Sequence, residues 1–287
     1  MVLCLPVTRK EHMIASVILT TYNEPEWLEK VLWGYSVQEE SDFEVVIADD
    51  GSGPETKQVL QTMQRKTDLK IKHVWHPDID FRKTIILNQA TVTAESEYLI
   101  YSDGDCIPPK DFVGTHLRLR RPGRFLSGGI VRMPMSLSKR ISSQDIIDNR
   151  ISSLRWLRQN GLSYNRKMLL LFKHRILSSL MDRITPTRAT WNGHNSSAWR
   201  EDIIAANGYD ERMKYGGLDR ELGERLINSG IQPIQIRHRS SCLHLDHAKP
   251  WKTRANWNRN CQIRRETRQL GLTRTEFGIA QQQADVA

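Results

Sequence analysis

Short apolar segments alternate with helix-like segments over the first hundred residues. Four runs rich in aliphatic and β-branched residues are predicted to be buried strands: 13–21, 43–48, 69–75 and 98–102. Between them, apolar residues recur at helical spacing in residues 28–35, 56–63 and 84–94. This order predicts an α/β fold with a mostly parallel, doubly wound, Rossmann-like sheet that has helices on both faces.

Polar side chains follow three of these strands at their carboxyl ends. Residues 20–23 (TTYN) follow the first strand, Asp49-Asp50 the second and Asp103-Gly104-Asp105 the fourth. Because these ends share one edge of a parallel sheet, we expect the polar residues to gather in one crevice. Two carboxylates on such a loop suit Mg²⁺ or Mn²⁺, and a divalent ion suits a diphosphate. Taken alone, the acidic triplet is more typical of a solvated turn than of a metal site.

The second half of the chain lacks this regular alternation. Residues 138–188 are basic and helical in tendency, around an apolar centre at 168–172. Two interpretations stay open: a solvated helical face around a buried centre, or a surface that contacts a membrane or an anionic acceptor. The other predicted elements are a strand at 125–132, a binding loop at 190–199, helices at 200–204 and 220–229, a strand at 231–236 and a basic amphipathic helix from 251 onward.

Charge and cysteine usage narrow the class of protein. The 287 residues carry a formal net charge of +9, which favours an anionic partner: nucleic acid, a membrane surface or a phosphorylated substrate. The four cysteines are widely spaced, so we expect a reducing cytoplasm without a disulfide framework. No run approaches the roughly 20 apolar residues that cross a bilayer, and residues 1–11 do not resemble a secretion signal. We therefore expect a soluble or peripheral protein.

Two common phosphate-binding motifs are missing. The chain has neither GxGxxG after its first strand nor a Walker-type GK[ST] sequence, which argues against dinucleotide-binding and P-loop proteins. A nucleotidyltransferase would share the sheet and the metal-binding acids, but it usually needs a glycine-rich loop where residues 20–23 stand. Phosphate would instead be held by a metal ion and by Lys or Arg.

Several blocks, in this order, resemble one enzyme family. The blocks 16–23, 46–52 and 103–108 are similar to the nucleotide-sugar half of family 2 glycosyltransferases with the GT-A fold. The blocks 193–195, 207–211 and 216–219 resemble the acceptor half of chondroitin-polymerase-like and β-1,4-galactosyltransferase-like members. The resemblance implies one GT-A domain over 1–287, with a nucleotide-sugar half at 13–109, an acceptor and catalytic half at 110–250 and a basic C-terminal helix at 251–287.

The resemblance also implies donor-binding roles. The residues expected to contact the nucleotide are Thr20, Tyr22, Asn23, Asp49, Asp50, Arg82, Lys83 and Asp103. Tyr22 and Thr20 would contact uracil, the acids would contact uracil or ribose, and Arg82 and Lys83 would neutralise the diphosphate. The alternative for the acids is turn formation and capping. For the two basic residues it is ordinary surface charge.

A metal site and a base follow from the same resemblance. The expected metal ligands are Asp103, Asp105, His244 and His247, a mixed oxygen and nitrogen set that suits Mn²⁺ somewhat more than Mg²⁺. Asp219 would deprotonate the acceptor hydroxyl, although Leu218 stands where the family usually has Glu. A helix N-cap is the alternative role for Asp219.

The residues expected at the donor-sugar or acceptor site are Trp191, Asn192, His194 and Asn195, with Trp191 either stacking on a sugar or serving as a core aromatic. We thus expect an inverting, metal-dependent glycosyltransferase that uses a nucleotide sugar, UDP-linked by preference, and a glycan or glycolipid acceptor in bacterial surface polysaccharide or lipopolysaccharide synthesis. It would be cytoplasmic and peripheral on the inner face of an anionic membrane. The alternatives are a nucleic-acid-binding protein, which leaves the acid-terminated strands unexplained, a non-catalytic sugar-binding relative and a nucleotidyltransferase.

Overall fold

The computed structural model describes residues 13–172, 174–248 and 253–284. The expectations for residues 1–11 and for Trp251 and Lys252 at the start of the tail lie outside the described residues. The strands are β1 (Ala15–Thr21), β2 (Phe43–Asp49), β3 (Lys70–Trp75), β4 (Tyr98–Asp103), β5 (Cys106–Ile107), β6 (Arg124–Ser127), β7 (Gly129–Arg132), β8 (Ser196–Trp199), β9 (Gln232–Gln235) and β10 (Ser241–His244).

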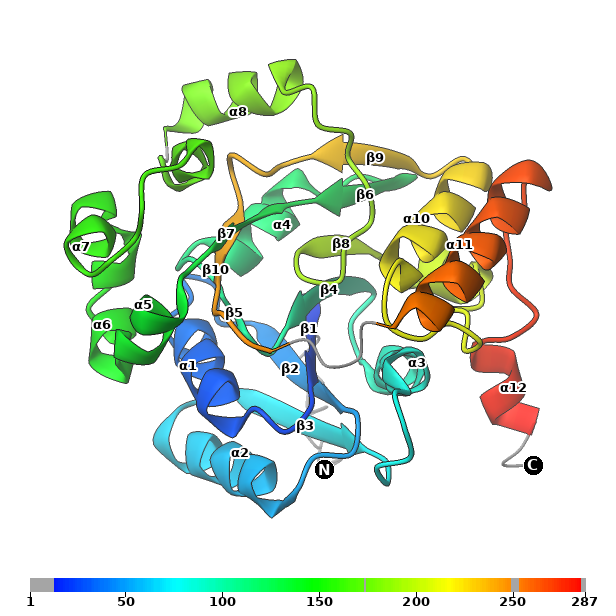
Figure 1. The fold of residues 1–287 in the computed structure, drawn as a ribbon, viewed down its shortest axis with the longest axis horizontal. Coiled ribbons are helices and arrows are strands. Elements are labelled where there is room, and N and C mark those ends of the chain that lie inside the picture. The colour runs from blue at the N-terminus through cyan, green and yellow to red at the C-terminus, as the bar shows by residue number, and fades with distance from the viewer. Residues whose placement is uncertain (1–12, 173, 249–252, 285–287) are drawn as a thin grey trace, which may run out of the picture.

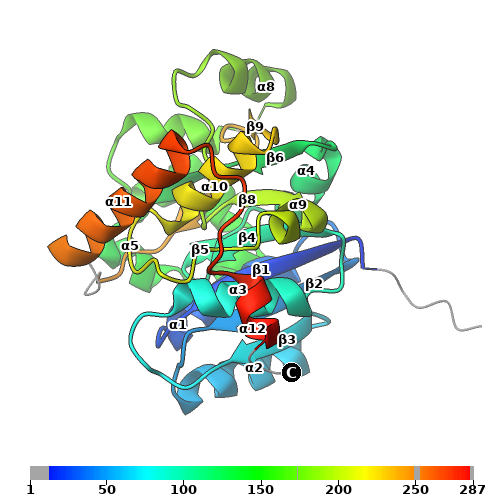
Figure 2. The same ribbon diagram turned by 90° about the vertical axis from the view of Figure 1, so that its right-hand side faces the viewer.

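Helices surround these strands (Figures 1 and 2). The α-helices are α1 (Pro25–Ser36), α2 (Pro54–Lys66), α3 (Lys83–Thr93), α4 (Phe112–Leu119), α5 (Met135–Arg140), α6 (Ser143–Ile147), α7 (Leu154–Gln159), α8 (Arg175–Ile184), α9 (Arg200–Ala205), α10 (Leu218–Asn228), α11 (Arg254–Gln269) and α12 (Ile279–Ala284). Two 3₁₀-helices, η1 (Arg150–Ser152) and η2 (Arg166–Leu171), lie between α6 and α8. Among the described residues, no helix is both long enough and apolar enough to span a membrane.

The central sheet has seven strands in the order β3-β2-β1-β4-β8-β6-β9. The first four are parallel, and β8 runs antiparallel to both β4 and β6. In the register of β1 and β4, Thr20 lies opposite Asp103, and in that of β1 and β2, Thr21 lies opposite Asp49. The polar strand ends therefore meet at one edge, as the sequence predicted.

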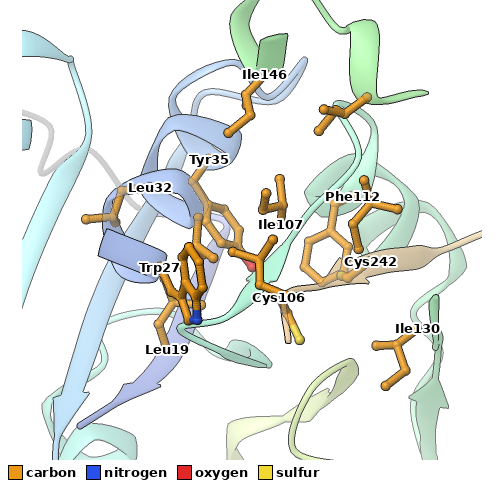
Figure 3. Close-up of a cluster of buried hydrophobic side chains, with 14 of the residues drawn as sticks. Leu19, Trp27, Leu32, Tyr35, Cys106, Ile107, Phe112, Ile130, Ile146 and Cys242 are labelled. Carbon is orange, nitrogen blue, oxygen red and sulfur yellow. The ribbon is translucent and has the colours of Figure 1, made fainter. Parts of the chain in front are cut away.

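Alternate residues of the buried strands supply two separate cores. Val17 and Leu19 pack with α1 and α2 on one face, whereas Ile18 packs with α3, α9 and α10 on the other. Figure 3 shows part of the first core, where the ring of Tyr35 lies near Ile107 and Phe112. Helices thus cover both faces of a mostly parallel sheet, which confirms the predicted fold class.

The second half differs from the sequence prediction in several elements. The expected strand at 125–132 is two short strands, because β6 joins the large sheet and β7 joins a three-stranded sheet in the order β5-β10-β7. The expected binding loop at 190–199 ends in the buried strand β8. The described part of the tail forms two helices, α11 and α12. The division of the chain at 109 and 250 stays a prediction.

Candidate active site

A cleft of about 700 Å³ opens at the carboxyl edge of the parallel strands. Its walls come from the ends of β1 and β4, from β7 and β10, and from the start of α10. The predicted site residues that line it are Thr20, Tyr22, Asn23, Asp50, Lys83, Asp103, Asp105, His194, Asp219, His244 and His247. Residues from both halves of the chain therefore share one cavity.

Asp103 is held at the floor of this cleft by two donors. The Oγ1 of Thr20 and the Nζ of Lys83 each donate a hydrogen bond to Asp103 Oδ1 at 2.7 Å. Burial acts to raise the pKa of the Asp103 carboxyl, but the Lys83 ammonium together with His194 and the Thr20 hydroxyl outweighs it, and the pKa falls well below its usual range. The pKa of Lys83 is raised in turn: its own burial acts to lower it, and the carboxylates of Asp103, Asp219 and Asp105 together outweigh that effect. Asp103 is therefore a carboxylate at any pH near neutrality.

Gly104 explains why the turn after β4 is so tight. Its N–H donates to the carbonyl oxygen of Thr20 at 2.7 Å, and a Cβ at this position would lie only 2.8 Å from that oxygen. Only glycine allows this approach without a backbone shift. The turn places Asp105 one residue beyond, with its carboxyl pointing to the small sheet.

Asp105 meets two histidines from β10 and the loop after it. The pairing of β5 and β10 sets His244 opposite Cys106. Asp105 Oδ2 lies 2.9 Å from His247 Nε2 and 3.7 Å from His244 Nε2, and the two imidazoles are stacked with centroids 5.4 Å apart. Burial acts to raise the pKa of Asp105, but both histidines oppose it and the pKa is lowered.

The donor set fits a divalent cation. Ligand atoms of Asp105, Cys106 and His244 lie within 4.8 Å of one another, and Nδ1 of His244 is buried without a hydrogen-bond partner. Burial raises the pKa of the Cys106 thiol well above its usual value, so that sulfur stays protonated and is a poor ligand. The remaining set is one carboxylate and two imidazoles, a mixed oxygen and nitrogen set that can hold a divalent cation. Asp103 is engaged by Lys83 and lies beside this set.

Asp219 lies in the first turn of α10. The two glycines just before this helix, residues 216 and 217, take the left-handed backbone conformation that favours glycine (φ 104° and 81°). Its Oδ1 is buried and has no hydrogen-bond partner. Burial raises the pKa of this carboxyl to about 6, with Lys83 acting to lower it and Asp103 to raise it. The backbone N–H groups of Gly193 and of Asp219 itself also act to lower this pKa. A carboxylate in a cleft with a pKa near neutrality is suited to take a proton.

His194 adds a neutral group to the same cleft. Burial lowers the pKa of its imidazole to about 4, so the ring is uncharged near neutrality. Its carbonyl oxygen accepts a hydrogen bond from Ser102 Oγ at 3.1 Å, which ties the loop before β8 to β4. His194 can therefore donate or accept one hydrogen bond without adding charge.

Asp50 and Tyr22 border the cleft where it meets the loop that follows β3. Asp50 accepts the N–H of Arg82 at 3.1 Å and pairs with Nε2 of His76 at 2.8 Å. The Tyr22 hydroxyl donates to Asp78 at 3.0 Å. Both side chains remain part of the cleft wall. This region offers an aromatic ring and carboxylates of the kind that contact a nucleoside.

Asp49, Asn23 and Arg82 take local structural roles. Asp49 is fully buried, accepts the N–H of Ser52 and pairs with His73, so it does not line the cleft. Asn23, in the left-handed region at φ 50°, accepts the N–H of Gly53, although it also borders the cleft. The guanidinium of Arg82 bonds to the carbonyl of residue 77 and does not line the cleft. The structure thus does not bring Asp49 or Arg82 to the predicted ligand.

Three of the four predicted sugar-site residues lie elsewhere. Trp191 is fully buried, with its Nε1 donating to the Tyr209 hydroxyl, so the prediction of sugar stacking is wrong and the core alternative is right. Asn195 is fully buried and donates to the carbonyl oxygens of residues 129 and 240, which ties the two sheets together. Asn192 donates to Ser127 and does not line the cleft. Core packing and hydrogen bonds within and between the sheets therefore hold these three side chains away from the cleft.

Among the exposed residues of the cleft wall that sequence reasoning missed are one arginine and one tryptophan. Arg132, at the end of β7, lies opposite His244 in the strand register and makes no ion pair with any described residue. Trp257, on α11, is 49% exposed and covers Gly216, whose Cβ position lies 3.2 Å from the indole ring. In the sequence, only the residue type pointed to either one: Arg132 is a cation at the end of a predicted strand, and Trp257 is an aromatic residue within the basic tail.

Comparisons with known proteins agree on one family. The model described as glycosyl transferase family 2 matches residues 16–170. The uncharacterized glycosyltransferase YfnE of Bacillus subtilis is 24% identical over 271 residues, which cover 84% of this chain and 67% of the relative. The chain spans between about half and two thirds of the length of this relative and of the two validoxylamine A glucosyltransferases of Streptomyces hygroscopicus that it also matches.

Two solved structures share the fold. The mannosyltransferase PcManGT from Pyrobaculum calidifontis, in complex with GDP-Man and Mn²⁺, has a TM-score of 0.55 at 17% identity and covers 90% of this chain and 62% of its own. S. aureus TarS 1–349, in complex with UDP-GlcNAc, has a TM-score of 0.62 at 14% identity and covers 94% of this chain and 69% of its own. These likenesses show the GT-A arrangement that the sequence predicted.

Proposed function

Because this chain belongs to glycosyl transferase family 2, we propose that it is an inverting, metal-dependent glycosyltransferase that moves a sugar from a UDP-linked donor to a hydroxyl of a glycan or glycolipid. The observation that carries the proposal is the shared cleft. It holds Asp219, with its buried oxygen, together with Asp105, His244 and His247. The UDP-GlcNAc and the GDP-Man with Mn²⁺ in the two structural neighbours support a nucleotide-sugar donor and a divalent ion.

Asp219 supplies the base that this reaction needs. In a single displacement, the acceptor oxygen forms a bond to C1 of the sugar while the bond from C1 to the diphosphate oxygen breaks and its electron pair leaves with the diphosphate. The proton of the acceptor hydroxyl moves to the carboxylate of Asp219, which lines the cleft. A pKa of about 6 leaves the carboxyl ionised at pH 7 yet basic enough to hold the proton.

The leaving diphosphate needs positive charge around it. Asp105, His244 and His247 would hold a divalent ion, which supplies Lewis-acid stabilisation of the diphosphate. Arg132 lies next to His244 and carries an exposed guanidinium that no described acid neutralises. Lys83 is already paired with Asp103, and Arg82 does not line the cleft. We therefore assign Arg132 to the diphosphate. The nucleoside would occupy the end of the cleft that Tyr22 and Asp50 border.

The biological setting remains part of the proposal. Synthesis of bacterial surface polysaccharide or lipopolysaccharide rests on the sequence resemblance, and a cytoplasmic location rests on the dispersed cysteines. Assays of sugar transfer to different glycan and glycolipid acceptors would test the pathway and the location.

Ligand-induced thermal stabilisation tests the donor and the ion together. Melting temperatures would be measured with UDP-glucose, UDP-galactose, UDP-GlcNAc and GDP-mannose, each with and without Mn²⁺. A donor near 100 times its Kd should raise the Tm by roughly 5–10 °C, and only when Mn²⁺ is present. Asp219→Asn should keep that shift in Tm. It should lose sugar transfer and also the slow hydrolysis of the donor by water.

Two results would overturn parts of this proposal. If no nucleotide sugar raises the Tm in the presence of Mn²⁺, the chain is not a nucleotide-sugar enzyme. If Asp219→Asn turns over donor at the wild-type rate, Asp219 is not the base.

A further inference from the structure

Helix α8 turns its apolar side away from the protein. Ile176, Leu180 and Ile184 recur at four-residue spacing along one stripe and are 76%, 50% and 63% exposed. Leu169 and Phe172, in the segment just before the helix, are 60% and 59% exposed. We call these five residues the α8 patch. Helix α8 lies at the outer margin of the molecule in both views (Figures 1 and 2).

The polar side of α8 faces the protein. Asp182 is buried, accepts the N–H of His238 at 2.8 Å and forms an ion pair with Arg239 at 2.7 Å. Ser178, on the same side, is also buried and bonds to the carbonyl of residue 172. An ordinary surface helix has the reverse arrangement, with the apolar side inward. The Asp182 anchor therefore fixes α8 with its apolar stripe outward.

Uncompensated positive charge surrounds the α8 patch. Arg166, Lys167, Arg183 and Arg188 are all exposed, and none has an ion pair with a described residue. Arg183 flanks the apolar stripe on α8 itself. The one acid within residues 163–188 is Asp182, which is buried and neutralised by Arg239. The surface around the patch is thus cationic.

We propose that the α8 patch docks on an anionic lipid membrane, with its apolar stripe in the interface and the flanking cations at the lipid headgroups. An apolar stripe bordered by Lys and Arg is the pattern of an interfacial helix, and each cation near an anionic surface strengthens its attraction. A second copy of the chain fits less well, because two cationic faces would repel each other. The sequence leaves a membrane contact open anywhere in the basic segment 138–188, and the proposal places it on α8 and the residues just before it.

Vesicle co-sedimentation tests the proposal on the full chain. The vesicles are phosphatidylcholine alone, or phosphatidylcholine and phosphatidylglycerol in equal parts. The wild-type protein should bind the anionic vesicles and not the neutral ones. The double variant Ile176→Asp/Leu180→Asp should lose about tenfold or more in vesicle affinity, because both side chains leave the interface and two repelled charges enter it.

A matched control separates the patch from general surface effects. Leu270→Asp/Leu272→Asp makes the same chemical change at two exposed leucines beyond α11, 71% and 38% exposed, and should keep wild-type binding. Arg166→Gln/Lys167→Gln should weaken binding to anionic vesicles roughly 5- to 30-fold while leaving the apolar stripe intact. Circular dichroism would show that each variant is folded.

Three results would overturn the proposal. They are no binding of the wild-type chain to anionic vesicles, unchanged binding by the Ile176→Asp/Leu180→Asp variant, and a dimer in light scattering that this variant dissociates. The last result would assign the patch to self-association. None of these readouts depends on sugar transfer, so the membrane surface and the enzymatic proposal stand or fall separately.

Discussion

The backbone at Gly193 and the carboxyl of Asp219 are in direct contact. A Cβ atom at residue 193 would lie 2.6 Å from Asp219 Oδ1, closer than real Cβ atoms approach an oxygen. The loop before β8 therefore sets the position of the proposed base at the start of α10. The two residues are 26 positions apart in the sequence (219 − 193), and only the fold brings them together.

Gly193→Ala should displace the Asp219 carboxyl and lower kcat about 10- to 100-fold, because small misplacements of a catalytic group are costly. Donor binding, measured by the Mn²⁺-dependent thermal shift, should change little. Gly114→Ala is the control, since a Cβ there meets no atom within 4 Å. A variant at residue 193 with wild-type kcat would contradict the positioning role.

The pKa of about 6 for Asp219 predicts an acid limb in the pH–rate profile. The active form is the carboxylate, so kcat/KM should rise tenfold per pH unit below about 6 and level off above 7. Steady-state transfer or donor hydrolysis between pH 4.5 and 8.5 measures this limb. A flat profile through pH 6 would rule out Asp219 as the titrating base.

Asp219 should also cost the folded state stability at neutral pH. Its folded pKa lies above its ordinary value of 3.8, so the folded state favours the protonated form. This stability is present below about pH 4 and is lost as the pH rises through about 6. Asp219→Asn should therefore raise the Tm by about 2–5 °C at pH 7.5 and by less at pH 4.5. A larger rise in Tm at pH 4.5 than at pH 7.5 would show that the buried, ionised carboxyl does not destabilise the folded protein.

His247→Ala and Asp105→Asn should each weaken Mn²⁺ binding. Loss of an outer partner of a metal site typically costs 10- to 100-fold, and loss of a direct ligand should cost at least ~100-fold. Water-proton relaxation measures Mn²⁺ affinity without any sugar transfer. His174→Gln, at the start of α8, serves as the control histidine. Unchanged Mn²⁺ affinity in both site variants would place the metal elsewhere.

The helix that carries Asp219 depends on a buried ion pair. Arg225 and Glu221, 0% and 1% exposed in their side chains, meet at 2.7 Å, and Thr267 of α11 donates to the same carboxylate. Arg225→Met should cost about 3–5 kcal/mol, because it leaves the Glu221 charge buried and unpaired. Arg150→Met, which breaks the ion pairs of a half-exposed arginine with Asp145 and Asp148, should cost at most ~1 kcal/mol. Urea unfolding compares the two, and equal losses would contradict the distinction.

The first hundred residues could be read from sequence because their signals are local. The apolar runs became β1, β2 and β4 within one or two residues of the predicted bounds. The later elements were harder, since residues 125–132 divide between two sheets according to partners far away in the chain. Hydrogen bonding to distant strands, and not local pattern, decides where such a run breaks.

Adjacent residues of the same type show the limit of sequence reasoning most clearly. Asp49 and Asp50 are indistinguishable in the sequence, yet Asp49 turns inward to His73 and Asp50 borders the cleft, because successive side chains at a strand end point to opposite sides. Trp191 and Trp257 are a second case. Trp191, which was considered for sugar stacking, is fully buried, whereas Trp257 from the tail lines the cleft.

The sequence by itself determined the parallel sheet, the polar strand ends and the chemical types needed for a metal site and a base. Those features depend on apolar periodicity and on turn residues, which act over a few positions. Tertiary structure alone decided which acids and histidines meet. The pairing of β5 with β10 brings His244 to Asp105, and burial between Gly193 and α10 gives Asp219 its raised pKa. Solvent exclusion and strand register arise only when distant segments pack.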